Sequence, residues 1–115
     1  MIKSTLFALS LSVAAAPCFA HAKLESSTPA GNAQLAAAPQ TLMLKFNEAA
    51  TIAVLKLISA GKEIPIPVDK SAKPDRTFTF SLPRLAPGSY TVQWSVVAAD
   101  DGHVTKGSFS FTITG

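Results

Sequence analysis

Short stretches in which apolar and polar residues alternate run through most of the chain after residue 21, and each of them predicts a β-strand. Successive side chains of a strand point to opposite faces of the sheet, so a period of two collects the apolar residues on one face. The clearest stretches are residues 41–46, 77–81, 90–96 and 108–113. Further strands are expected at residues 23–27, 52–58 and 63–68, and no long stretch after residue 21 has a convincing helical repeat.

About seven short strands with regular spacing and turn signals between them predict an all-β sandwich or barrel. Two turns favour the sandwich. Pro29, Ala30, Gly31 and Asn32 separate the first strand from the second. Residues 85–90 have the form Leu-x-Pro-Gly-x-Tyr, which is typical of a tyrosine corner, where the phenol bonds to upstream backbone and stabilises a Greek-key crossover. Tyr90 is therefore assigned to structure, and Trp94, on the core-facing side of the same strand, to packing.

Length and composition fit a single small domain of this kind. The chain has 115 residues, 48% of them hydrophobic, which is enough for a real core. Charged residues make up 15% and there are 8 prolines, a profile that suits turn-rich β structure. The polar segment at residues 69–75 is expected to be a surface loop. The net charge of +3 and the absence of any run of Lys or Arg argue against a nucleic-acid partner.

The first 20 residues have the pattern of a secretory signal peptide, which would be removed. Lys3 supplies the positive start, residues 6–16 are apolar, and small residues stand where a signal peptidase reads, ending at Ala20. An uncleaved membrane anchor is the alternative, but the apolar run is short for a spanning helix. We therefore expect residues 1–20 to be a signal peptide, residues 21–115 to form one periplasmic domain, and no membrane insertion after cleavage.

Cleavage after Ala20 has consequences for the mature chain. It removes Cys18, the only cysteine, so no disulfide is expected and stability must come from the core. It also removes Lys3, which lowers the net charge from +3 to about +2. Most importantly, it makes His21 the first residue.

The two histidines of the mature chain, His21 and His103, suggest a metal site. An N-terminal histidine offers its α-amine and its ring Nδ1 as a chelating pair, and a strong Lewis acid displaces the proton of the amine near neutral pH. Asp101 adds a carboxylate oxygen two residues before His103, and in an extended segment the two side chains would point the same way. Three nitrogens and one oxygen in a plane suit Cu(II) better than zinc.

Each of these residues also has an ordinary structural explanation. His21 could simply be the residue that follows a cleavage site. Asp101 and Gly102 are a common turn pair, which Asp100 or Asp101 could simply cap. His103 could be an exposed loop residue. The metal hypothesis rests on the combination, because both histidines are used and one has a carboxylate close by in sequence.

Several segments of the chain resemble the CopC family of periplasmic copper-resistance proteins. Residues 21–29 (His-Ala-Lys-Leu-Glu-Ser-Ser-Thr-Pro) are similar to the mature start of that family, and residues 44–48 (Leu-Lys-Phe-Asn-Glu) to its second-strand motif. Residues 85–94 resemble its tyrosine-corner strand. Residues 101–103 and 107–111 resemble its Asp-x-His loop and last strand. The resemblance covers nearly the whole mature chain.

The resemblance implies an immunoglobulin-like Greek-key β-sandwich that binds one Cu(II) ion per chain. By motif, the ligands fall on His21 (amine and ring), Asp101 and His103, while Glu48 matches a position near the copper in some members. The implied role is a non-enzymatic carrier or buffer in copper homeostasis or resistance. Its expected partners are the copper ion and an inner-membrane copper transporter, and the protein itself is expected to be a monomer.

The chain departs from the family pattern in two places. Val104 follows the ligand histidine where many members have proline, which should affect the stiffness of the loop and not the donor atoms. Some members also carry a Met-rich loop that binds Cu(I) through thioethers. Here residues 57–73 contain no methionine, and the two methionines are Met1 and Met43. We therefore expect no Cu(I) site.

Two other classes of function stay open at this stage. A copper monooxygenase also uses a chelating N-terminal histidine, but Asp101 would fill the position that oxygen needs, and no exposed aromatic platform for a polysaccharide is apparent. A metal-free interaction module is the other alternative, because sandwiches of this kind host many unrelated roles.

Overall fold

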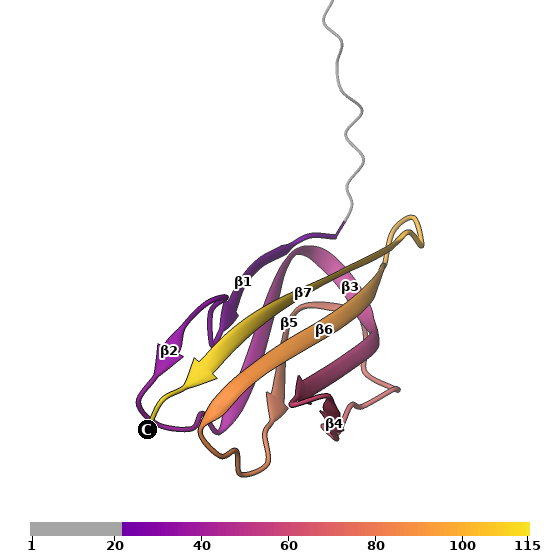
Figure 1. Cartoon of the computed structure of the whole chain (residues 1–115). Helices are drawn as coiled ribbons and strands as arrows, with labels where there is room; N and C mark the ends of the chain where they lie inside the picture. Colours follow the sequence, from indigo (N-terminus) through magenta and orange to yellow (C-terminus); the bar gives the residue numbers. More distant parts are fainter. Residues whose placement is uncertain (1–21) are drawn as a thin grey trace, which may run out of the picture.

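Seven strands form one sheet that curls into two facing layers in the computed structural model, which describes residues 22–115 (Figure 1). The strands are β1 (Leu24–Thr28), β2 (Gln34–Leu35), β3 (Thr41–Ser59), β4 (Lys62–Ile64), β5 (Asp75–Ser81), β6 (Gly88–Ala98) and β7 (Val104–Ile113). Their order in the sheet is β1-β3-β6-β7-β2, and β4 and β5 also pair with β3. The predicted all-β sandwich with about seven strands is confirmed.

Strand β3 belongs to both layers and therefore joins them. Its first part pairs with β1 and β5, with Leu42 opposite Phe80, and its second part pairs with β6, with Leu57 opposite Val92. The pairing with β5 jumps from Lys45 to Ala50, so the strand changes partners over that stretch. Because the strand passes from one layer to the other, the two halves of one long strand face each other across the core.

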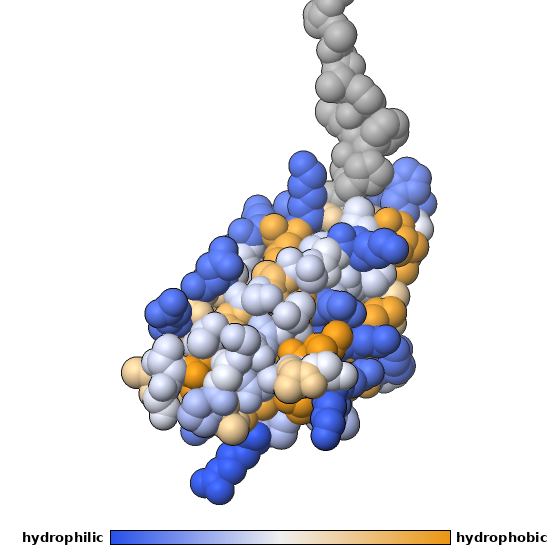
Figure 2. Space-filling model, viewed as in Figure 1, coloured by the Kyte–Doolittle hydropathy of each residue, from blue (hydrophilic) through white to orange (hydrophobic). Residues whose placement is uncertain are grey.

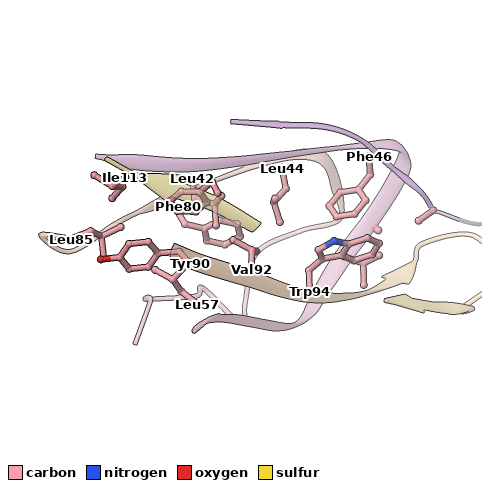
Figure 3. Close-up of a cluster of buried hydrophobic side chains, with 14 of the residues drawn as sticks. Leu42, Leu44, Phe46, Leu57, Phe80, Leu85, Tyr90, Val92, Trp94 and Ile113 are labelled. Carbon is pink, nitrogen blue, oxygen red and sulfur yellow. The ribbon is translucent and has the colours of Figure 1, made fainter. Parts of the chain in front are cut away.

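The core lies between the layers and contains most of the apolar positions that the alternation identified. Leu42, Leu44 and Phe46 of β3 are fully buried, and their polar neighbours Thr41 and Lys45 are exposed. The facing layer contributes alternate residues of β6, and Figure 3 shows Val92 and Trp94 directed at the β3 side chains. Burying one such side chain is worth about 1.5–3 kcal/mol, so this cluster supplies most of the stabilisation.

The tyrosine corner predicted at residues 85–90 is present. The hydroxyl of Tyr90 donates a hydrogen bond to the carbonyl of Ala86, and the ring stacks on Phe111 with centroids 5.5 Å apart. Trp94 is 8% exposed and meets Phe46 edge-on at 5.3 Å. Both aromatic residues therefore pack in the core, as expected from the sequence.

Three details of the predicted strands are wrong. The strands expected at residues 41–46 and 52–58 are parts of the single strand β3. The strand expected at residues 63–68 ends at Ile64, because Pro65 and Pro67 have no amide proton for a ladder. The two-residue strand β2, which runs parallel to the end of β7, is too short for an alternation to reveal.

The remaining sequence predictions concern segments outside the strands. Residues 69–74 form the predicted loop, in which Asp69 accepts hydrogen bonds from the amide and hydroxyl of Ser71. Among residues 22–115, no helix is long and apolar enough to cross a membrane. The expected signal peptide, residues 1–20, lies outside the described part of the chain. On the face shown in Figure 2, hydrophobic side chains form small patches between polar ones.

Gly107 occupies a position where a side chain has no room, which gives a testable prediction. Gly107 pairs with Trp94 across the β6–β7 ladder, and a Cβ added there would lie 2.7 Å from Cζ2 of the indole. Because Trp94 is packed against Phe46, the ring has little freedom to move away. We expect Gly107→Ala to lower the free energy of unfolding by about 1–3 kcal/mol, measured by urea denaturation.

Gly31→Ala is the matched control for that substitution. The added methyl group would meet Cβ of Phe109 at 3.5 Å, an ordinary contact, and Gly31 has no positive φ. Its effect should stay within about 0.5 kcal/mol. Equal unfolding midpoints for the two variants would show that Trp94 does not restrict position 107.

Candidate metal centre

The turn between β6 and β7 brings Asp101 and His103 to one end of the sandwich. The two strands pair as far as Val97 and Val104, so residues 98–103 close the hairpin. The amide of Ala98 donates to the carbonyl of His103 at 2.9 Å, and the amide of Gly102 donates to the carbonyl of Ala98 at 3.0 Å. Gly102 has a φ of 72°, a conformation that favours glycine, and this lets the chain reverse between the two polar residues.

Asp101 and His103 contact each other twice. Oδ1 of Asp101 accepts the backbone N–H of His103 at 3.0 Å, and Oδ2 lies 3.2 Å from Nδ1 of the imidazole. The side chains are 33% and 53% exposed, respectively, so both face solvent at the rim of the fold. The two residues converge, but through a hydrogen-bonded turn and not through the extended segment expected from the sequence.

This geometry has a chemical consequence for the imidazole. A carboxylate beside Nδ1 favours a proton on that nitrogen, so the lone pair of the neutral ring is on Nε2. A carboxylate in this position also fixes the orientation of the ring, as the partners of metal-bound histidines commonly do. The pair therefore offers a nitrogen donor and carboxylate oxygens within a few ångströms of each other.

The start of the described chain is attached beside this turn. Ala22 is 1% exposed, and its carbonyl accepts a hydrogen bond from Oγ1 of Thr105 in β7 at 2.7 Å. The amide of Lys23 donates to Oδ1 of Asn47 in β3 at 2.7 Å, and the amide of Asn47 donates to the carbonyl of Lys23 at 3.0 Å. The N-terminal segment is thus held by both β3 and β7.

A shallow depression lies beside the contact between this segment and the start of β7. Its lining includes residues 22–24 on one side, residues 103–106 on the other, and Trp94. Figure 1 shows the same arrangement on a larger scale, because the β6–β7 turn and the start of the described chain lie at the same end of the molecule. His103 therefore lies next to the N-terminal segment, although more than 80 residues separate them in sequence.

Glu48 lies in β3 between two residues that contact this region. Asn47, before it, bonds to Lys23, and Ala49, after it, accepts the amide of Ala99 at 3.0 Å. Glu48 itself is half-buried. Its backbone is thus at the same end of the sandwich as Asp101 and His103, which keeps it a candidate for the site.

The structure brings together two of the three predicted ligands. Asp101 and His103 are in contact, while His21 lies outside the described residues. Within residues 22–115, no group of three or more His, Cys, Asp or Glu side chains could hold a metal ion.

Asn47 and Thr105 were not singled out from the sequence, although both contact the segment next to the site. A faint signal exists for Asn47, because asparagine is uncommon inside strands and its presence in an alternating stretch suggests a side-chain role. Thr105 gives no such signal, since threonine is common in strands. Their partners lie 24 and 83 residues away in sequence, which no local pattern reveals.

Fold and candidate site together define a small Greek-key β-sandwich with a histidine–carboxylate pair on its rim, beside the N-terminal strand. The family model for the CopC domain matches residues 24–114, nearly all of the described chain. The chain belongs to the CopC family, as the sequence motifs indicated.

Relatives with curated names support the same assignment. The chain is 34% identical over 125 residues to copper resistance protein C of Xanthomonas campestris pv. juglandis, covering 97% of this chain and 94% of the relative. It is 32% identical over 117 residues to the protein YobA of Escherichia coli strain K12, with the same coverage of each chain.

Solved structures match over most of the chain as well. CopC from Methylosinus trichosporium OB3b aligns with a TM-score of 0.70 and 29% identity, covering 82% of this chain and 94% of that one. PcoC, a methionine-rich copper resistance protein from Escherichia coli, aligns with a TM-score of 0.67 and 27% identity, covering 83% and 100%. The sandwich architecture is therefore that of the family.

Proposed function

We propose that this protein binds one Cu(II) ion per chain in the periplasm and acts as a carrier or buffer in copper homeostasis or resistance. Its relatives include proteins named for copper resistance, and membership of the CopC family supports copper as the cargo. The ligands in this proposal are the amine and ring of His21, the carboxylate of Asp101 and the ring of His103. Glu48 is a further candidate at the edge of this set.

One observation carries the proposal, namely that the Asp101–His103 pair lies beside the anchored N-terminal segment. The carbonyl of Ala22 is bonded to Thr105, two residues after His103. One peptide bond joins Ala22 to His21, and successive Cα atoms are about 3.8 Å apart. A chain that begins at His21 therefore has its amine and imidazole within reach of the pair.

The donor set determines the oxidation state that we propose. Three nitrogens and a carboxylate oxygen favour Cu(II) in a tetragonal geometry, whereas Cu(I) prefers thioether and thiolate sulfur. PcoC is described as methionine-rich, but this sequence contains only Met1 and Met43, and Met1 is in the expected signal peptide. The proposed site is accordingly a Cu(II) site without a Cu(I) counterpart.

A binding role without catalysis fits the surface of the described domain. All Phe, Tyr and Trp side chains of residues 22–115 are buried or half-buried, including Trp94 and Tyr90 at 8% and 4% exposure. They therefore provide no aromatic platform for a polysaccharide. With Asp101 as a fourth ligand beside the three proposed nitrogens, the site would also leave no open position for oxygen.

The proposed location and partners follow from the first 20 residues. A cleaved signal peptide would deliver the domain to the periplasm and release the amine of His21 in the same step. Exposure of Asp101 and His103 at the rim would let an acceptor approach the ion directly. An inner-membrane copper transporter is the proposed acceptor, and the carrier itself would be a monomer.

Replacing His103 tests the proposal directly. We expect His103→Ala, made in protein that begins at His21, to remove one nitrogen from the hyperfine pattern in the EPR spectrum of the Cu(II) complex. Cu(II) affinity should fall by more than about 100-fold, because losing a ligand costs more than losing one of the outer partners that are worth 10–100-fold. The measurements are EPR and competitive titration with a chelator of known affinity.

Asp100→Ala is the matched control for that experiment. Asp100 is an exposed residue in the same turn, next to Asp101 but outside the proposed ligand set. Its replacement should leave the spectrum unchanged and alter the affinity only slightly. An unchanged EPR spectrum for His103→Ala would exclude this ligand set.

A further inference from the structure

Two side chains from different strands hold a single peptide group next to the candidate metal centre. The carbonyl of Ala22 and the amide of Lys23 belong to the same planar peptide unit. Thr105 donates to that carbonyl at 2.7 Å, and Asn47 accepts from that amide at 2.7 Å. The peptide unit is therefore bound on one side to β7 and on the other side to β3.

Neighbouring contacts restrict this segment further. The amide of Asn47 donates to the carbonyl of Lys23 at 3.0 Å, so Asn47 bonds to the segment with both its side chain and its backbone. Ala22 is 1% exposed and belongs to the hydrophobic core. With its side chain buried and its carbonyl bound, the Cα of Ala22 has little freedom of position.

Thr105 also links the segment to the donor pair. It lies in β7 two residues after His103, and β7 begins directly after the turn that carries Asp101 and His103. The hydrogen bond from its hydroxyl therefore ties the N-terminal segment to the strand that directly follows the histidine. Asn47 does the equivalent from β3, next to Glu48.

We propose that Asn47 and Thr105 are positioning residues for the metal ion. Their two hydrogen bonds to the peptide group between Ala22 and Lys23, called the peptide clamp below, order the N-terminal segment before copper binds. This inference rests on the proposed function, in which the residue before Ala22 supplies two donors. A chelating residue on a loose chain end loses conformational freedom when it binds, and ordering the chain in advance removes part of that cost. The clamp thus raises Cu(II) affinity without contributing a ligand.

A purely structural role for these hydrogen bonds predicts different behaviour. If they only stabilised the fold, their removal would lower the melting temperature and leave Cu(II) affinity unchanged at temperatures where the protein is folded. If they position the N-terminal segment, affinity falls while the ligands and the spectrum stay the same. Measuring affinity, EPR and stability on the same variants distinguishes the two roles.

The experiment uses protein that begins at His21 and a pair of substitutions at each position, one that removes the polar group and one that keeps it. Thr105→Val removes the hydroxyl and keeps the shape, whereas Thr105→Ser keeps the hydroxyl. Asn47→Ala removes the acceptor, whereas Asn47→Asp keeps an oxygen at the same place. Thr91→Val is the control, because it removes a strand hydroxyl that bonds to Ser110 and not to the N-terminal segment.

We expect Thr105→Val and Asn47→Ala each to bind Cu(II) about fivefold more weakly than the unsubstituted protein, the cost of one net hydrogen bond. Thr105→Ser and Asn47→Asp should restore most of the affinity, and Thr91→Val should have no effect on it. The EPR spectra of the copper-loaded variants should match that of the parent. In the metal-free protein, the amide of Lys23 should exchange faster with deuterium in both weakened variants.

The outcomes that would overturn this inference are distinct from those that would overturn the proposed function. If the unsubstituted protein does not bind Cu(II), the proposed function is wrong, and the role proposed for the clamp is wrong as well. A parent that binds Cu(II), together with unchanged affinity in Thr105→Val and Asn47→Ala, would overturn the clamp alone. Equal losses in Thr105→Val and Thr105→Ser would also overturn it, because the hydroxyl would then not matter.

Discussion

Adding one alanine in front of His21 is expected to abolish tight Cu(II) binding and to leave the fold intact. The addition turns the proposed amine ligand into an amide, whose lone pair is delocalised into the carbonyl, and it breaks the chelate ring with the imidazole. Since outer partners of metal ligands are already worth 10–100-fold in affinity, loss of a ligand should cost more than about 100-fold. Competitive titration and EPR of the extended and unextended proteins measure this.

The fold should be insensitive to the same change, which makes the result easy to interpret. The described contacts of the N-terminal segment begin at Ala22, and the core begins there as well. The extended protein should therefore have the same circular dichroism spectrum and melting temperature as the parent. An alanine added after Gly115, at the end of the molecule opposite the β6–β7 turn in Figure 1, is the control. An extended protein with unchanged affinity and spectrum would exclude the amine as a ligand.

Phe46→Ala is expected to have the largest effect on stability. Phe46 is 0% exposed and meets the ring of Trp94 edge-on at 5.3 Å (Figure 3). It also meets the ring of Phe78 edge-on at 6.1 Å. Removing a buried phenylalanine costs about 3–5 kcal/mol, because the transfer free energy is lost and a cavity is left. A domain of this size has a total stability of about 5–15 kcal/mol, so the loss is a large fraction of it.

Urea denaturation followed by Trp94 fluorescence measures this loss, because the indole is in contact with the deleted ring. Val54→Ala is the control, since Val54 is also in β3 but is 41% exposed. Its effect should be within about 0.5 kcal/mol. Similar unfolding midpoints for the two variants would mean that the core does not close around Phe46 as described.

These two expectations separate the stability of the domain from its proposed chemistry. The core between the layers supplies the folding free energy, while Asp101 and His103 lie on the rim with much of their surface exposed. Substitutions at the rim should therefore change copper binding with little effect on folding. Replacing Phe46 in the core should affect both folding and copper binding. Phe46 directly precedes Asn47, so a shift in β3 at this point would reach the N-terminal segment.

Much of the fold can be predicted from the sequence, because the patterns that specify it involve residues close together in the chain. A period of two in hydrophobicity gives strand direction and the buried face, as for Leu42, Leu44 and Phe46. The tyrosine corner is a short motif, and its bond from Tyr90 to Ala86 spans four residues. The alternation does not predict the continuity of β3, because a strand that passes between two layers loses its strict alternation over residues 47–53.

The sequence by itself determined the fold class, most of the core residues and the chemical types of the candidate ligands. The tertiary structure decided that Asp101 and His103 meet through a turn, and that Asn47 and Thr105 bind one peptide group near the N-terminal end. The physical reason is the separation along the sequence between the residues that make each contact. Periodicity reports which face a residue takes along its own strand, whereas a contact between Thr105 and Ala22 exists only after 83 residues have folded around a common core.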